Sequence, residues 1–179
     1  PAANTALARS HSGVVMIGGA DVTRVVPQKR GIGFVFQHYA AFKHMTVRDN
    51  VAFGMTIRKR AKAQVEARVD ELLGIVGLAG FQKRYPSQLS GGEQQRTAIA
   101  RALVHDPRLI IADEPTGNLD PLISWEILQL LLRINELGVT VLMATHNAEV
   151  VTALRKRVVA LEEGRIIRDE VGGAYHRED

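Results

Sequence analysis

The segment LSGGEQQRTAIARAL, residues 89–103, carries residue types that bind anions at the start of a predicted helix. Ser90 and Glu93 have the S-x-x-E spacing of a capping box, which places a helix N-terminus at this point. The first N–H groups of a helix lack intrahelical acceptors, and with the helix dipole they attract an anion such as phosphate. Gly91 and Gly92 have no Cβ, which lets a ligand approach the backbone. A plain capped helix after a Gly-Gly turn is the alternative interpretation.

Acidic residues follow an apolar segment in LIIADEP, residues 109–115. Ligands of open α/β sheets bind outside the carboxyl ends of the strands, which is where Asp113 and Glu114 are expected to lie. Asp113 suits Mg²⁺, which prefers oxygen ligands and keeps several waters. Glu114 suits the orientation or deprotonation of an attacking water. The alternative is an acidic turn that ends a strand before Pro115.

Two more polar residues follow apolar segments that predict strands. Gln37 ends FVFQ, and its amide could bind a metal-bound water or a partner. His146 ends VLMATH, and a neutral imidazole there could contact a terminal phosphate. Alone, the first also fits a loop-entry residue and the second a capping or core residue. Polar residues at several strand ends, combined with a Gly-Gly anion site, indicate phosphoryl chemistry.

The apolar pattern predicts the elements that position these residues. Apolar and β-branched segments predict strands at residues 14–17, 32–36, 108–113, 139–145, 157–164 and 165–170. Helical periodicity runs from about residue 46 to about residue 105, and turn signals stand at Gly54, Gly77–Gly80 and Pro86. Further helices are predicted at residues 122–138 and 147–156. This alternation predicts a parallel sheet covered on both faces, with a mostly helical segment inserted.

Within the helical segment, residues 63–77 predict an amphipathic helix. Its apolar face consists of Val65, Val69, Leu72 and Leu73.

Composition narrows the class of protein. The chain has 179 residues, 46% of them apolar, and no cysteine, which predicts one domain without disulfides or thiolate metal sites. No apolar run approaches the ~20 residues of a membrane helix, and residues 1–13 lack the order of a secretory signal, so a soluble, cytoplasmic protein is expected. The formal charge is +4. The basic run at residues 57–62 predicts a solvated helix face or, alternatively, contact with lipid headgroups or an acidic partner.

The order of these motifs resembles the nucleotide-binding subunits of ABC transporters. Gln37, LSGGE, LIIADE, GNLD (residues 117–120) and His146 resemble the Q-loop, signature motif, Walker B strand, D-loop and H-loop of that family. The resemblance implies an α/β fold, namely a P-loop NTPase-like ABC ATPase core with a parallel sheet and an inserted helical subdomain. It implies one domain, with a core lobe at residues 12–37 and 106–170 and a helical signature subdomain at residues 46–105.

The resemblance also implies a site for ATP and Mg²⁺. Gln37 would touch the Mg²⁺ site and relay its state to a membrane partner, and Asp113 would hold the metal through water. Glu114 would act as the catalytic base, and His146 would contact the γ-phosphate. A peripheral location at the inner face of the cell membrane follows, and the partner would be a transmembrane permease or a membrane subunit of a division complex.

A second ABC ATPase subunit is the other implied partner, in a homo- or heterodimer. Ser90, Gly91 and Gly92 would act on the nucleotide held by the opposite subunit of a head-to-tail dimer, and Asp120 would lie at the dimer junction. The anion expected at the Ser90 helix is therefore the γ-phosphate of a partner's ATP.

Two subfamilies share the resemblance. Residues 31–54 are similar to the ATPases of sulfate-type importers, whereas the later motifs are more similar to the cell-division and lipoprotein-export group.

The phosphate loop of the family, G-x-x-x-x-G-K-[ST], is not found, because no glycine is followed by lysine. In the family that loop precedes the strand at Val14, and residues 5–13 resemble the end of the helix that follows it. Without the loop and its strand, we expect weak Mg-ATP binding, feeble hydrolysis at most, and exposed apolar residues in the strands at 109–112 and 139–144. The expected protein is marginally stable or self-associating.

Other functions are also compatible with the motifs. A catalytically deficient or regulatory module would supply only the signature and D-loop surfaces to a partner's site. Relatives in DNA repair and chromosome organisation share LSGG-type signatures, but they carry long coiled coils, and this chain has no heptad run. We therefore expect no nucleic-acid partner.

Overall fold

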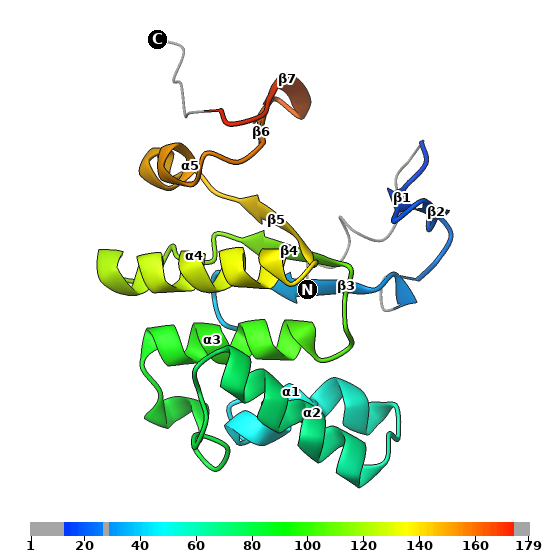
Figure 1. The fold of residues 1–179 in the computed structure, drawn as a ribbon, viewed down its shortest axis with the longest axis vertical. Helices are drawn as coiled ribbons and strands as arrows, with labels where there is room; N and C mark the ends of the chain where they lie inside the picture. Colours follow the sequence, from blue (N-terminus) through cyan, green and yellow to red (C-terminus); the bar gives the residue numbers. More distant parts are fainter. Residues whose placement is uncertain (1–12, 27–28, 174–179) are drawn as a thin grey trace. The chain divides into compact units, whose positions relative to one another are not determined.

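A computed structural model describes residues 13–26 and 29–173 (Figure 1). The chain divides into two compact units, of which one ends at Ala144 and the other begins at Thr145. The helix end predicted at residues 5–13 lies outside the described residues, apart from Gly13. The predicted division into a core lobe and a helical subdomain stays a prediction.

The first unit is built around a parallel three-stranded sheet in the order β3-β4-β5. Its strands are β3 (Ile32–Val35), β4 (Leu109–Asp113) and β5 (Thr140–Ala144). Val35 pairs with Ala112, and Asp113 pairs with Ala144, so the three carboxyl ends meet at one edge. A short antiparallel hairpin, β1 (Met16–Ile17) and β2 (Ala20–Asp21), precedes the sheet in the chain.

Helices cover this sheet and extend away from it. They are α1 (Val47–Ile57), α2 (Lys62–Ile75), a 3₁₀ turn (Pro86–Gln88), α3 (Gly91–Leu103) and α4 (Pro121–Glu136). Helix α3 packs against β3, α4 packs against β5, and α1 and α2 pack with α3 (Figure 1). The predicted apolar face of α2 is buried at all four positions, which are Val65, Val69, Leu72 and Leu73. This face belongs to one continuous apolar core with α1, α3, α4, β3 and β4.

The turn predicted at Gly54 is wrong, because Gly54 lies inside α1. A Cβ built on Gly54 would lie 2.5 Å from Nε2 of His105. The glycine therefore serves the close approach of the His105 ring to α1 and does not break the helix.

The prediction that the sheet is covered on both faces does not hold at β5 in the described part of the chain. Half-buried and exposed residues alternate along β5, and Leu142 is 55% exposed. In β4, by contrast, Ile110 and Ala112 are fully buried. The predicted exposure of apolar strand residues is thus confirmed at Leu142, and Ile110 and Ala112 are exceptions to it.

The second unit contains α5 (Ala148–Leu154), β6 (Val158–Glu162) and β7 (Arg165–Glu170). Strands β6 and β7 form an antiparallel hairpin. The Arg157 guanidinium bonds both carboxylate oxygens of Asp169 at 2.7 and 2.6 Å and holds the pKa of that carboxyl below its usual value. Across the residues described in both units, no helix has the length and apolar character needed to span a bilayer.

Candidate functional site

The carboxyl ends of β3 and β4 bring Gln37, Asp113 and Glu114 to one edge of the sheet. Glu114 has a positive φ of 43°, a conformation that non-glycine residues seldom adopt. Its backbone N–H donates to Ala144 O at 3.0 Å, and its own carbonyl accepts from Gly117 N–H at 3.1 Å. The turn after the strand is therefore fixed by hydrogen bonds on both sides of Glu114.

Gln37 is in contact with the segment that resembles a D-loop. A Cβ built on Gly117 would lie 2.7 Å from Nε2 of Gln37, so the amide lies directly against this glycine. Asn118 Nδ2 donates to Gln37 O at 3.3 Å and lies 3.3 Å from Nδ1 of His38. The predicted Q-loop and D-loop residues thus meet within one protomer.

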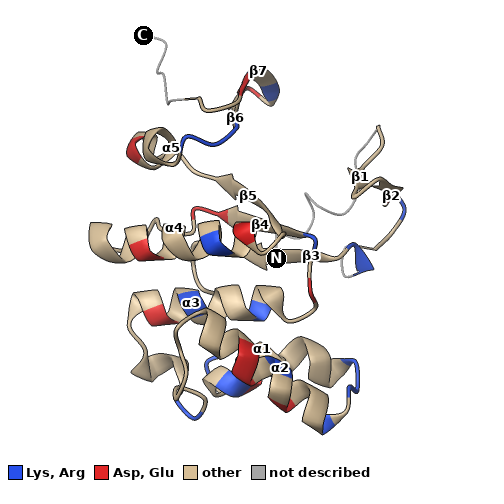
Figure 2. Cartoon of the chain, in the orientation of Figure 1, with Lys and Arg blue, Asp and Glu red and all other residues tan. Residues whose placement is uncertain are grey.

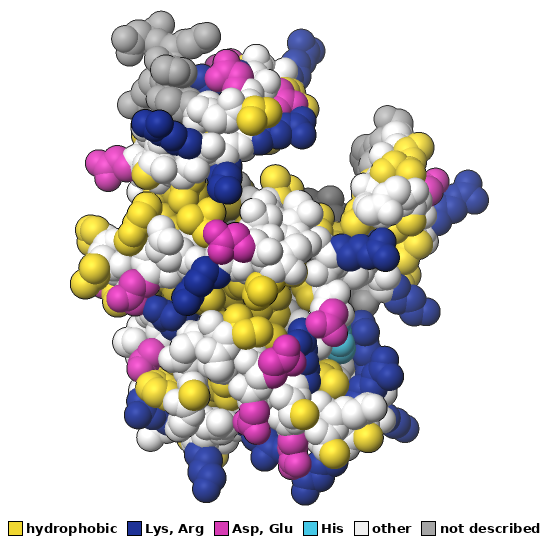
Figure 3. All heavy atoms as spheres, viewed as in Figure 1, with side chains coloured by type: hydrophobic (Ala, Val, Ile, Leu, Met, Phe, Trp, Pro, Cys, Tyr) yellow, Lys and Arg dark blue, Asp and Glu magenta, His cyan; other side chains and the backbone are white. Residues whose placement is uncertain are grey.

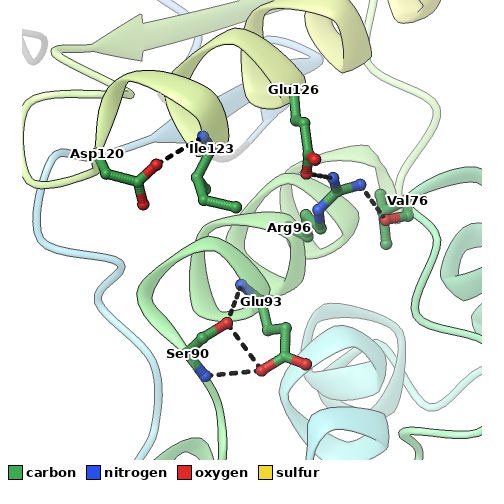
Figure 4. Close-up of polar contacts among 7 residues, drawn as sticks. All are labelled: Val76, Ser90, Glu93, Arg96, Asp120, Ile123 and Glu126. Atoms are coloured by element: carbon green, nitrogen blue, oxygen red, sulfur yellow. Dashed lines mark hydrogen bonds and ion pairs between the residues drawn. The ribbon is translucent and has the colours of Figure 1, made fainter.

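The capping box at the start of α3 is present as predicted (Figure 4). Ser90 Oγ accepts from Glu93 N–H at 3.3 Å, and Ser90 N–H donates to a carboxylate oxygen of Glu93 at 2.7 Å. The first intrahelical bond runs from Gln94 N–H to Ser90 O, so the N–H groups of Gly91 and Gly92 precede it. These N–H groups are the ones that could bind an anion.

Both glycines also serve packing within the chain, which the sequence did not reveal. A Cβ on Gly91 would lie 2.9 Å from Oη of Tyr39, and a Cβ on Gly92 would lie 2.6 Å from Cγ2 of Ile123. The close approach that glycine permits here is made by Tyr39 and Ile123. Packing is therefore a reason for glycine that is independent of any ligand, and Gly92 is buried. Ligand approach at these two glycines stays a prediction.

Asp120 caps α4, the helix that carries Ile123. Its Oδ1 accepts from Ile123 N–H at 3.0 Å, and Pro121 follows at the first helical position (Figure 4). The starts of α3 and α4 are thus held together through Ile123 and Gly92. The role of Asp120 at a dimer junction stays a prediction.

Two residues of α3 that sequence reasoning missed connect it to its surroundings. Arg96 donates to Val76 O at 3.0 Å and forms an ion pair with Glu126 of α4 at 2.7 Å (Figure 4). Gln95 is fully buried, and its Nε2 donates to Pro115 O at 2.6 Å. Gln95 occupies an apolar position of the helical pattern, which was the signal available in the sequence. Arg96 lies on a partly polar face, so its position gave no signal.

Arg101, a third missed residue of α3, holds the segment after Gln37. Its guanidinium donates to Ala40 O at 2.7 Å and to Tyr39 O at 3.0 Å, and it lies 5.6 Å from the Phe42 ring centroid. Burial lowers the pKa of Arg101 and raises the pKa of the Tyr39 phenol. Phe42 packs on Phe53 of α1 at 4.4 Å, so these aromatics fold back onto helices of their own chain.

A hollow of about 830 Å³ lies beside this segment, between β3 and the ends of α1 and α3. Its charged and aromatic lining consists of Lys29, Phe34, Phe36, Arg58, Arg101 and His105. The connection between α1 and α2, which contributes Arg58, is basic and exposed (Figures 2 and 3). The basic run at residues 57–62 is thus the end of α1, this connection and the first residue of α2.

The metal prediction rests on Asp113 and Gln37. Within residues 13–26 and 29–173, no group of three or more His, Asp or Glu side chains gathers as a metal cage. Mg²⁺ needs no such cage, because it is held by one or two carboxylates, waters and substrate phosphates. The exposed Asp113 carboxylate and the adjacent Glu114 fit that donor set. His146 lies in the second unit, and its proximity to Glu114 stays a prediction.

Comparison with known proteins settles the family. A family model described as "ABC transporter" matches residues 3–117. The chain belongs to the ABC transporter family. This result agrees with the order of the motifs and with the parallel sheet that carries them.

The curated relatives include both kinds that the motifs indicate. The sulfate/thiosulfate import ATP-binding protein CysA of Nocardia farcinica is 58% identical over 161 residues, which is 89% of this chain and 48% of that protein. The cell division ATP-binding protein FtsE of Streptococcus pneumoniae is 51% identical over 151 residues, or 84% of this chain and 66% of that protein. The chain thus spans about half the length of the CysA relatives it matches.

A solved structure shares the fold. The dimeric ATP-binding cassette MJ0796, in a post-hydrolysis state bound to ADP and Pi, has a TM-score of 0.78 and 33% identity. The match covers 94% of this chain and 77% of that one. The ABC ATPase fold predicted from the motifs is therefore confirmed.

Proposed function

We propose that this chain is the ATP-binding subunit of an ABC-type membrane complex of the importer or cell-division kind. It would couple ATP binding and hydrolysis, across a head-to-tail dimer, to a membrane partner. The observation that carries the proposal is the sheet edge at which Gln37, Asp113 and Glu114 follow paired strands. The dimeric relative bound to ADP and Pi supports ATP as the nucleotide.

The residues divide into two roles in this proposal. Asp113, with Gln37 near it, would hold Mg²⁺, which supplies charge neutralisation to the phosphates. Glu114 would orient and deprotonate the attacking water, and His146 would contact the γ-phosphate. The capped start of α3 would bind the nucleotide held by the second subunit.

The membrane partner would meet the chain at the basic hollow beside residues 38–50. Lys29, Arg58, Arg101 and His105 line this hollow without an acidic residue, and Phe34 stacks near Phe36 at 6.0 Å. An amphipathic segment with a carboxylate suits such a lining. The chain itself would then lie at the inner face of the membrane as a peripheral subunit.

A mixed dimer tests this function. The probe is Nocardia CysA with the signature serine of its own motif replaced by alanine, so that its homodimer hydrolyses ATP poorly. The expected result is that adding this chain restores hydrolysis and that adding its Ser90→Asn variant does not. An unchanged rate with the wild-type chain would contradict the proposal.

A second arm concerns this chain's own site, which the signature serine of the partner completes. It uses Nocardia CysA with that serine intact and the lysine of its phosphate loop replaced by alanine, so that only this chain's site can turn over ATP. If the chain turns over ATP, the mixed dimer hydrolyses it, and Glu114→Gln removes this activity and traps an ATP-bound dimer. If the chain acts only in trans, this mixed dimer shows no hydrolysis, and the chain is the module that supplies signature and D-loop surfaces.

A further inference from the structure

Gln95 connects the signature helix to the turn that carries Glu114. It lies in the second turn of α3, is fully buried, and donates through Nε2 to Pro115 O at 2.6 Å. A carbonyl oxygen can only accept a hydrogen bond, so this contact fixes which end of the amide faces Pro115. The bond joins residues 20 positions apart in the chain.

The turn that receives this bond has an unusual backbone. Glu114 has φ of 43°, and Pro115 has no N–H to donate. Glu114 N–H donates to Ala144 O, which anchors the turn to β5. The Gln95 amide anchors the next residue of the turn, Pro115, to α3. These contacts hold the backbone on either side of the Glu114 Cα.

Packing alone does not explain a glutamine at this position. Gln95 Oε1 is buried and has no hydrogen-bond partner among the described residues. A leucine or methionine would fill a similar volume without an unpaired buried acceptor, which is costly. The bond to Pro115 O is therefore the contribution that an apolar residue could not make.

We propose that Gln95 is a positioning residue that sets the Glu114 turn from the signature helix. The inference rests on the proposed function, in which the start of α3 binds the nucleotide of a second subunit. Ser90 caps the helix that carries Gln95, so a shift of the helix N-terminus moves the anchor of Pro115. Engagement of the partner's nucleotide thereby adjusts the catalytic base of the chain's own site.

Amide hydrogen exchange tests the positioning role without ATP. The reporters are the N–H groups of Gly117 and Leu119, which donate to Glu114 O and Thr116 O. Gln95→Glu at about pH 8 and Gln95→Met should each lower their protection by about tenfold. Methionine conserves volume and keeps the variant folded. Gln94→Glu, on the same turn of α3, is the matched control and should leave protection unchanged.

A pH profile separates positioning from general loosening. A protonated carboxylic acid can donate to Pro115 O again, and burial favours the protonated form. Protection in Gln95→Glu, relative to wild type at each pH, should therefore recover as pH falls from about 8 to about 6. Recovery should not occur in Gln95→Met.

The activity readout keeps the two proposals apart. In the mixed dimer with the phosphate-loop variant of CysA, where turnover takes place at this chain's own site, Gln95→Glu should lower kcat with little change in KM for ATP. Unchanged protection of Gly117 and Leu119 in both folded variants overturns the positioning role. A different outcome is lost protection in the Gln95 variants together with no effect of the wild-type chain on ATP hydrolysis in the mixed dimers. It supports the positioning role and counts against the proposed function.

Discussion

The side-chain amide of Gln37 lies against Gly117, where an added Cβ would stand 2.7 Å from Nε2. The atom that would be displaced is the end of a flexible side chain, so the clash can be relieved with little loss of stability. Gly117→Ala should therefore cost less than about 1 kcal/mol of unfolding free energy and still move Gln37. The side-chain NH₂ signal of Gln37 in a ¹⁵N correlation spectrum measures the movement, and a urea titration measures stability.

Gly74→Ala is the control for this experiment. Gly74 lies inside α2, has no atom within 4 Å of an added Cβ, and is remote in sequence from both loops. It should leave the Gln37 signal in place. An unmoved Gln37 signal in Gly117→Ala would contradict the close contact.

Substitution by alanine should have opposite effects on stability at Gly33 and at Gly74. A Cβ on Gly33 in β3 would lie 2.6 Å from the backbone oxygen of Ala102, which cannot move without displacing α3. Gly33→Ala should destabilise the fold by about 1–3 kcal/mol through overpacking. Gly74→Ala should stabilise it by roughly 0.5–1 kcal/mol through helix propensity. Urea midpoints of the two variants check the difference, and equal midpoints would refute it.

Ser90 has a structural role as a cap and a proposed role toward a nucleotide, and two variants separate them. Ser90→Ala removes the acceptor for Glu93 N–H and should cost about 1 kcal/mol. Ser90→Asn retains a good capping residue and should cost only a few tenths. Loss of function in the asparagine variant, at nearly wild-type stability, would identify a role of the hydroxyl beyond capping. Full function in that variant would leave the cap as its only role.

The sequence contained enough information for the strands and helices that carry the motifs. Apolar runs such as LIIA and the i, i+3, i+4 pattern of residues 65–73 depend on local spacing, and the structure has them as predicted. The capping box at Ser90 was also local. Each of these features is decided by neighbours within a few residues.

What could not be predicted depends on contacts between distant residues. In the sequence Gly54 resembles a helix breaker. In the structure it makes room for His105, which lies about fifty residues later in the chain. Gly92 resembles a ligand-binding glycine until Ile123 is placed against it. The bonds from Gln95 to Pro115 and from Arg101 to Tyr39 likewise join separate motifs. Spacing along one chain does not specify such pairs.

His105 predicts a pH dependence of stability. Burial lowers its pKa below the usual value, Arg58 and Arg60 lower it further, and Asp106 and a bond with the Gly54 backbone oppose the shift. Between the folded pKa and the higher unfolded pKa, the unfolded chain binds more protons, so stability falls as pH falls. The urea midpoint should therefore drop between about pH 7.5 and about pH 5.5.

The matched variant for this prediction is His105→Gln, which cannot titrate. Its midpoint should change less than that of the wild type over the same pH range, because only the imidazole contribution is removed. Identical slopes for the two proteins would assign the dependence to other groups.

We expect copies of this chain to associate through β5, because Leu142 is exposed there. It is 55% exposed on a strand that is paired on one side with β4, and exposed apolar residues on an edge strand favour pairing with another chain. Leu142→Thr keeps a good strand former and removes the apolar contact. It should shift the sedimentation-velocity distribution toward monomer at high protein concentration.

Leu137→Thr is the control for this prediction. Leu137 is 71% exposed at the end of α4, away from the strand edge, so its replacement should not shift the distribution. A wild-type chain that stays monomeric throughout would contradict this prediction, whereas equal shifts in both variants would assign the association to exposed leucines in general.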